Sequence, residues 1–139
     1  MNPPRRLVVD PSAILALVLA DEDPEVALQV LQRIGRRQAL TPPLFWFELR
    51  NVLVVNERRG RLSPAETDDF LRTFATLPLE VAPLPHDLAV LTLAREHDLT
   101  IYDAAYLELA SRTGSELATL DKKLQRAAVA VGVPLWPEG

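Results

Sequence analysis

Residues 7–10 read Leu-Val-Val-Asp, and residues 116–121 read Glu-Leu-Ala-Thr-Leu-Asp. In each stretch a short apolar run, which predicts a buried strand, leads into an aspartate. Functional groups of open parallel sheets gather at the carboxyl ends of the strands, because loops and helix N-termini converge there. We therefore expect Asp10 and Asp121 at one edge of a sheet. The alternative is that each aspartate only caps the helix that follows it.

Outward from these two stretches, short β-rich runs alternate with longer helical ones. Strands are predicted at 7–9, 79–82 and 116–120, with a possible edge strand at 133–136. Helices are predicted at 11–20, 24–36, 44–59, 86–97 and 100–112, with further helices beginning at the capping-box sequence 63–66 and at residue 121. Strands spaced by helices indicate the α/β class and a mostly parallel sheet covered on both faces. No linker or repeat divides the chain, so we expect one domain over residues 1–139.

The composition restricts the possible chemistry. The 139 residues are 48% hydrophobic and 24% charged, which is ordinary for a globular domain, and none is cysteine. Disulfides, zinc-thiolate sites and thiol nucleophiles are therefore excluded, and any metal must be held by oxygen or by the two histidines. The lack of cysteine is compatible with a reducing cytoplasm. The net charge of -4 argues against a surface that binds nucleic acid through its overall field.

The apolar run near the N-terminus resembles a signal peptide only superficially. Arg5 and Arg6 precede it, but Asp10-Pro11 places a charge and a helix-disfavouring proline within it. The run is also too short to span a membrane. We expect no secretion signal and no membrane anchor, and a cytoplasmic location.

Glu48 lies in the most apolar predicted helix, residues 44–59. A helix that is apolar on almost every side is buried or lies at an interface. A buried carboxylate without a partner costs several kcal/mol, so Glu48 should meet Arg50, a neighbouring chain or a cation. A simple ion pair at the edge of the apolar face is the structural alternative. Asn51 adds a polar group one turn along the same face.

Asp103 is the fourth acidic candidate, in the first turn of the helix that begins at Thr100. By itself it could be the acidic member of a capping box. Four carboxylates that converge would repel one another unless a divalent cation held them. Oxygen ligands favour Mg²⁺ or Mn²⁺, ions that suit hydrolysis of phosphodiester bonds.

Four sequence motifs, in this order and spacing, resemble those of PIN-domain proteins. They are VVDPSAI at 8–14, ELRNVL at 48–53, YDAAYLELA at 102–110 and ATLDKKL at 118–124. The similarity is greatest to VapC-type toxins of toxin-antitoxin pairs, which are single PIN domains of about this length. The resemblance covers nearly the whole chain.

The resemblance implies a three-layer α/β/α sandwich with a mostly parallel central sheet of four or five strands. It also implies Mg²⁺ or Mn²⁺ dependence, endonucleolytic cleavage of RNA, homodimerisation and inhibition by a cognate antitoxin. Asp10, Glu48, Asp103 and Asp121 match the acidic quartet of the family, as catalytic residues and metal ligands. Ser12 and Thr119 match small hydroxyl positions that we expect to orient the acids or metal-bound water, and Asn51 matches a polar position beside the glutamate.

Other features of the sequence leave two interpretations open. Lys122 and Lys123 directly follow Asp121 and could contact phosphate, or they could be solvated helix residues. The cluster Phe45-Trp46-Phe47 could stack nucleobases, but inside an apolar helix it favours a core or dimer interface. His86 and His97 have no second metal-binding motif beside them, so we interpret them as structural or solvent-facing.

Competing functions make different demands on the sequence. A binding module with the PIN fold that acts only through a protein partner would not need the intact acidic set. A receiver domain or a haloacid-dehalogenase-like phosphatase needs a second aspartate near the first, which Asp10-Pro11-Ser12 does not offer. Ser12 also lacks the G-x-S-x-G setting of a hydrolase nucleophile. The nuclease interpretation is therefore favoured.

Overall fold

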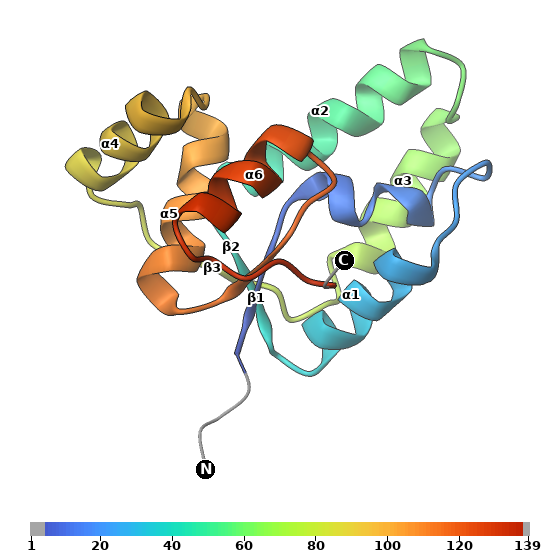
Figure 1. The fold of residues 1–139 in the computed structure, drawn as a ribbon. Helices are drawn as coiled ribbons and strands as arrows, with labels where there is room; N and C mark the ends of the chain where they lie inside the picture. The colour runs from blue at the N-terminus through green and yellow to red at the C-terminus, as the bar shows by residue number, and fades with distance from the viewer. Residues whose placement is uncertain (1–4, 138–139) are drawn as a thin grey trace.

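The first strand of the chain lies inside the central sheet of the computed structural model, which describes residues 5–137. The strands are β1 (Leu7–Val9), β2 (Ala39–Thr41), β3 (Glu80–Val81) and β4 (Glu116–Ala118). They lie in the order β3-β2-β1-β4, and every pairing is parallel. Helices flank the sheet, as Figure 1 shows. This architecture confirms the predicted α/β class, and the sheet has four of the four or five strands expected.

Six α-helices connect and cover the strands. They are α1 (Glu25–Gly35), α2 (Phe45–Arg58), α3 (Pro64–Phe74), α4 (Asp87–His97), α5 (Ile101–Thr113) and α6 (Lys122–Ala130). The capping box predicted for α3 is confirmed, because the Ser63 hydroxyl accepts from the Glu66 amide and the Glu66 carboxylate accepts from the Ser63 amide. Helix α5 ends at Gly114, whose φ of 64° is a conformation that favours glycine. None of the helices in residues 5–137 is long and apolar enough to cross a membrane.

The helix predicted over residues 11–20 is wrong. Two short 3₁₀ turns, η1 (Pro11–Ala13) and η2 (Leu15–Leu17), occupy this segment. The Ser12 amide bonds to the Asp10 side chain, and the Ile14 amide bonds to the carbonyl of Pro11, three residues back. The chain therefore closes in tight turns, and these bury Ile14 in the core.

The strands also differ from the prediction. Strand β2 was not predicted at all, and it consists of three buried residues directly before Pro42. The edge strand expected at 133–136 is reduced to one bridge, between Leu117 and Leu135. Strand β3 is shorter than the predicted range 79–82, and strand β4 is shorter than the predicted range 116–120.

The core lies where the central strands meet α5. Leu7, Val8 and Val9 are fully buried, and α5 buries an unbroken run from Ala104 to Ala110. Helix α5 packs directly on β1 and also contacts α4 and α6. Since α5 begins with Asp103 in its first turn, this packing fixes the start of the helix relative to the end of β1.

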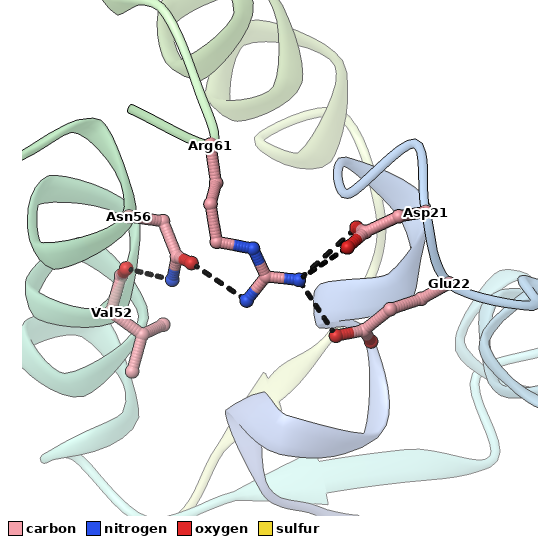
Figure 2. A network of polar contacts seen from close by, with 5 residues as sticks. All are labelled: Asp21, Glu22, Val52, Asn56 and Arg61. Carbon is pink, nitrogen blue, oxygen red and sulfur yellow. Dashed lines mark hydrogen bonds and ion pairs between the residues drawn. The ribbon is translucent and has the colours of Figure 1, made fainter. Parts of the chain in front are cut away.

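A polar network fixes the far end of α2, as Figure 2 shows. The Arg61 guanidinium donates to both Asp21 oxygens, at 3.1 and 3.2 Å, and to Glu22 Oε1 at 3.2 Å. It also donates to Asn56 Oδ1 at 3.3 Å, and Asn56 donates to the Val52 carbonyl at 2.7 Å. The segment after η2 is thereby joined to the C-terminal part of α2. Arg61 is therefore paired within the protein and is not a free basic group.

Candidate metal and active site

Asp10 lies at the carboxyl end of β1 and is held from two sides. Its Oδ1 accepts from the Ser12 amide at 3.0 Å, and its Oδ2 accepts from the Thr119 hydroxyl at 2.8 Å. The first bond caps η1, so the capping interpretation of Asp10 is confirmed. The second bond fixes the carboxylate against the end of β4. Capping and a role in a site are therefore compatible for this residue.

Ser12 and Thr119 join the ends of the two strands. The Ser12 hydroxyl accepts from the Leu120 amide at 2.9 Å and lies 3.4 Å from Thr119 Oγ1. Thr119 in turn accepts from the Asp121 amide at 3.1 Å. These contacts place the Thr119 hydroxyl between Asp10 and Asp121, with the Ser12 hydroxyl beside it. That the two hydroxyls orient the acids stays a prediction.

Asp121 and Asp103 both lie at the starts of helices. Asp121 is exposed and is the N-cap of α6, where its Oδ1 accepts from the Leu124 amide at 2.9 Å. Asp103 donates its amide to the Thr100 hydroxyl at 3.1 Å, so Thr100 is the N-cap of α5. Within residues 5–137 the Thr100 backbone amide does not donate to the Asp103 carboxylate, so the reciprocal half of the predicted capping box is absent there.

Glu48, in the first turn of α2, is half-buried and has a partner that the sequence analysis missed. The Tyr106 hydroxyl of α5 donates to Glu48 Oε1 at 2.6 Å. Arg50, a suggested partner, instead stacks over the Trp46 ring at 3.8 Å and donates to the Trp46 carbonyl. Tyr106 lies three residues after Asp103 in a predicted helix, which is the signal that could have placed it beside the acids.

Helix α2 is apolar on almost every side, but only one side of it is buried in the single chain. Phe45 is buried, but Trp46 and Phe47 are 54% and 70% exposed, so the core interpretation is wrong for these two residues. The interface and base-stacking interpretations stay predictions. Asn51 is exposed, and no hydrogen bond joins it to Glu48 in the described chain, so its expected support of the glutamate is not seen.

The four carboxylates act on one another electrostatically. Burial first, and then the charge of Asp121, raise the pKa of Asp10 above its ordinary value. The pKa of Asp103 is raised by burial and then by Asp121 and Asp10. The pKa of Glu48 is raised by burial, and the charges of Asp10 and Asp103 add to the shift. Groups from β1, α2, α5 and α6 are thus brought close enough to repel.

The donor set fits a hard divalent cation. Every group is a carboxylate oxygen, and a cation would relieve both the burial and the mutual repulsion. Residues 5–137 contain no three His, Asp or Glu side chains already arranged to hold a metal together. Mg²⁺ does not need such a cage, because it usually keeps several waters and takes only one or two carboxylates. The residues therefore fit an ion bound largely through water.

Buried Tyr106 remains a hydrogen-bond donor. Its pKa is raised well above the ordinary tyrosine value, first by burial and then by the adjacent Glu48 carboxylate. The phenol is thus protonated at any physiological pH. The Tyr106–Glu48 bond is therefore one between a neutral donor and a carboxylate.

Basic groups near the acids are few. Lys122 and Lys123 are exposed at the start of α6, and Lys123 Nζ pairs with Asp98 at 3.0 Å. The charge of Lys123 also lowers the pKa of Asp103, opposing the larger effect of burial. His86 precedes α4 and His97 ends it, and the described residues place neither in a metal-binding group.

Comparison with known proteins gives similarity along most of the chain. A family model described as the PIN domain matches residues 7–130. The protein named Ribonuclease VapC3 of Pyrobaculum aerophilum is 36% identical over 135 residues, which cover 93% of this chain and 99% of that protein. Another Ribonuclease VapC3, of Mycobacterium tuberculosis, is 32% identical over 91% of this chain and 90% of its own length. The crystal structure of PAE2754 from Pyrobaculum aerophilum superposes with a TM-score of 0.71 at 28% identity, covering 88% of this chain and 86% of that one.

Proposed function

The chain belongs to the PIN domain family, and on this premise we propose that it is a Mg²⁺- or Mn²⁺-dependent endoribonuclease. The observation that carries the proposal is that carboxylates from four distant parts of the chain lie at the end of β1 and at the starts of α2, α5 and α6. There Thr119 joins Asp10 to Asp121, and the charges of neighbouring acids raise the pKa of Asp10, Glu48 and Asp103. The relatives named as ribonucleases support RNA as the substrate. The reaction would be hydrolysis of a phosphodiester bond.

Asp10, Glu48, Asp103 and Asp121 would hold the metal, one or two of them directly and the others through its bound waters. When bound, the metal would supply an activated water and neutralise charge on the leaving oxygen. Asp10 and Glu48 each have one oxygen in a short hydrogen bond to a neutral hydroxyl, from Thr119 and Tyr106 respectively. These bonds fix the carboxylates without neutralising them, so their charge stays available to a cation.

The residues around the acids would have supporting roles. Ser12 and Thr119 would keep Asp10 and the start of α6 in place through the contacts between the strand ends. Lys122 and Lys123 would contact substrate phosphate, supported by their exposure beside Asp121. Asn51, which is exposed on α2, would face the substrate more readily than it would support Glu48.

The biological role that we propose is the toxin of a type II toxin-antitoxin pair, acting in the cytoplasm under control of an antitoxin. The names of the relatives support this assignment. A homodimer is part of the proposal, supported by large apolar side chains that the single chain leaves exposed. The most exposed are Phe47, Leu84 and Leu88.

Incubation of the purified protein with structured and single-stranded RNA tests the proposal. Cleavage is expected with Mg²⁺ or Mn²⁺, and none with EDTA or in the Asp103→Asn variant. Cleavage that continued in EDTA would contradict metal dependence. An intact RNA that the folded wild type binds without cutting would favour the alternative, a PIN-fold binding module that acts through a partner.

A further inference from the structure

A completely buried hydroxyl lies beneath the acidic site. Tyr106 is 0% exposed in the middle of α5, and its hydroxyl donates to Glu48 Oε1 at 2.6 Å. This is the shortest contact that joins α5 to the side chain of an acid on α2. A bond of this length between a hydroxyl and a carboxylate is of the strong, charge-assisted kind.

The position of this hydroxyl is itself fixed. The Thr41 side chain, at the end of β2, lies beside the phenol and acts to lower its pKa, against the larger effects of burial and of Glu48. Thr41 is also fully buried and donates to the Val9 carbonyl at 3.1 Å. Val9 directly precedes Asp10, so the residue beside the phenol is tied to the strand that carries the first aspartate.

Glu48 needs such a fixed partner more than Asp10 and Asp121 do. Asp10 and Asp121 are short side chains bonded to backbone amides at the starts of η1 and α6. Glu48 has a longer side chain with more rotamers, and Tyr106 is its one hydrogen-bonding side chain within residues 5–137. Its second oxygen, Oε2, has no hydrogen bond from that part of the chain.

We propose that Tyr106 is a positioning residue for Glu48: it holds Oε1 and leaves Oε2 turned to the site for a divalent cation. The inference rests on the proposed function, because it assigns Glu48 to metal binding. Tyr106 itself contacts neither metal nor RNA in this role. Its effect passes entirely through the glutamate.

The Tyr106→Phe variant tests this role, because it removes the hydroxyl and keeps the buried ring. Mn²⁺ affinity, measured by calorimetry on the protein without RNA, is expected to fall about tenfold, as is typical when a group that orients a metal ligand is lost. Cleavage should fall at low Mn²⁺ and recover substantially at saturating Mn²⁺. A general loss of structure would instead lower cleavage at every Mn²⁺ concentration.

Matched variants separate positioning from packing. Tyr102→Phe removes a hydroxyl from the same helix, at a residue that is 61% exposed, and should leave Mn²⁺ affinity unchanged. Tyr106→Phe introduced into Glu48→Ala should cause no further loss of Mn²⁺ affinity. Thr41→Val, which removes the hydroxyl beside the phenol, should weaken Mn²⁺ binding by a smaller factor and serves if Tyr106→Phe does not fold.

Three results would overturn the inference. They are wild-type Mn²⁺ affinity in Tyr106→Phe, an equal loss on adding Tyr106→Phe to Glu48→Ala, and absence of Mn²⁺ binding by the wild type. The proposed function has a separate readout. A wild type that binds Mn²⁺ in a way that depends on Glu48 and on the Tyr106 hydroxyl, but never cuts RNA, would refute the nuclease proposal and leave the positioning role intact.

Discussion

The hydroxyl of Thr119 lies 2.8 Å from Asp10 Oδ2 and thereby connects the end of β4 to the acid that ends β1. The Thr119 hydroxyl oxygen also accepts from the Asp121 amide at 3.1 Å. One buried side chain therefore influences the first and last acids of the quartet, which are 111 positions apart in the printed sequence.

Replacing this hydroxyl should weaken both the fold and the site. Thr119→Val keeps the shape but leaves the Asp121 amide and one Asp10 oxygen without their partner, so we expect a loss of about 1–3 kcal/mol in the free energy of unfolding. RNA cleavage should fall about tenfold at low metal. Urea unfolding and a cleavage time course measure the two effects. Thr76→Val, at an exposed hydroxyl after α3, is the control and should change neither.

Asp103→Asn should separate activity from stability. Cleavage should fall by more than about a hundredfold, because losing a ligand costs more than losing a group that supports one. The metal-free variant should nevertheless melt at a higher temperature than the wild type, since the raised pKa shows that the charged form is disfavoured in the fold. Asp87→Asn, an exposed first-turn acid of α4, is the matched control. Full cleavage by Asp103→Asn would remove this residue from the catalytic set.

Divalent metal should stabilise the folded protein by mass action. Free Mn²⁺ at a hundredfold excess over its Kd should add about 2.7 kcal/mol to the free energy of unfolding. Thermal melts with and without Mn²⁺ measure the shift, and it should be much smaller in Asp103→Asn and in Glu48→Gln. An equal shift in all three proteins would place the bound ion elsewhere.

The pH dependence of the metal-free protein follows from the direction of the pKa shifts. Asp10 and Asp103 have raised pKa values in the fold, so between the ordinary value of 3.8 and the raised values the folded state binds more protons than the unfolded state. Their contribution to stability therefore decreases as pH rises through that window. As the pH rises above 3.8, the wild type should lose stability relative to an Asp10→Asn, Asp103→Asn double variant. Parallel curves from urea unfolding would contradict the assigned shifts.

The lysines at the start of α6 should contribute to RNA binding through charge. Replacing Lys122 and Lys123 together with alanine should weaken RNA affinity and reduce the slope of log affinity against log salt by about 1–2. Filter binding with an inactive Asp103→Asn background over a salt series measures both. Arg36→Ala with Arg37→Ala changes a basic pair that precedes β2, at the opposite end of the sheet, and should leave the slope nearly unchanged.

The sequence predicted the position of the acids that follow strands. It did not predict contacts that depend on how the helices pack. Asp10 and Asp121 follow apolar runs, so their edge of the sheet was predictable. Glu48 was noticeable because it is a charge among apolar neighbours, but its partner Tyr106 was not. An aromatic residue in a helix is expected in the core, and only the fold shows that its hydroxyl points to a carboxylate.

The missed elements have physical reasons too. Strand β2 has three residues and no alternation of apolar and polar side chains, so no periodic pattern reveals it. Residues 11–20 have the composition of a helix, but the Asp10 side chain takes the Ser12 amide and the chain turns tightly instead. Trp46 and Phe47 are exposed because only one side of α2 meets the core, a fact that apolar composition conceals.

The network of Arg61 has a mechanical consequence for the acid at the other end of α2. Glu48, near the start of α2, accepts a hydrogen bond from Tyr106 of α5. The far end of α2 is joined through Arg61 to Asp21 and Glu22, so the helix is held at both ends. From Glu48 to Arg58 helix α2 is about 15 Å long at the usual rise per residue. Breaking the pairs of Arg61 with Asp21 and Glu22 would release the far end of α2. The helix could then tilt about its contact with α5, and the Glu48 carboxylate would move with it.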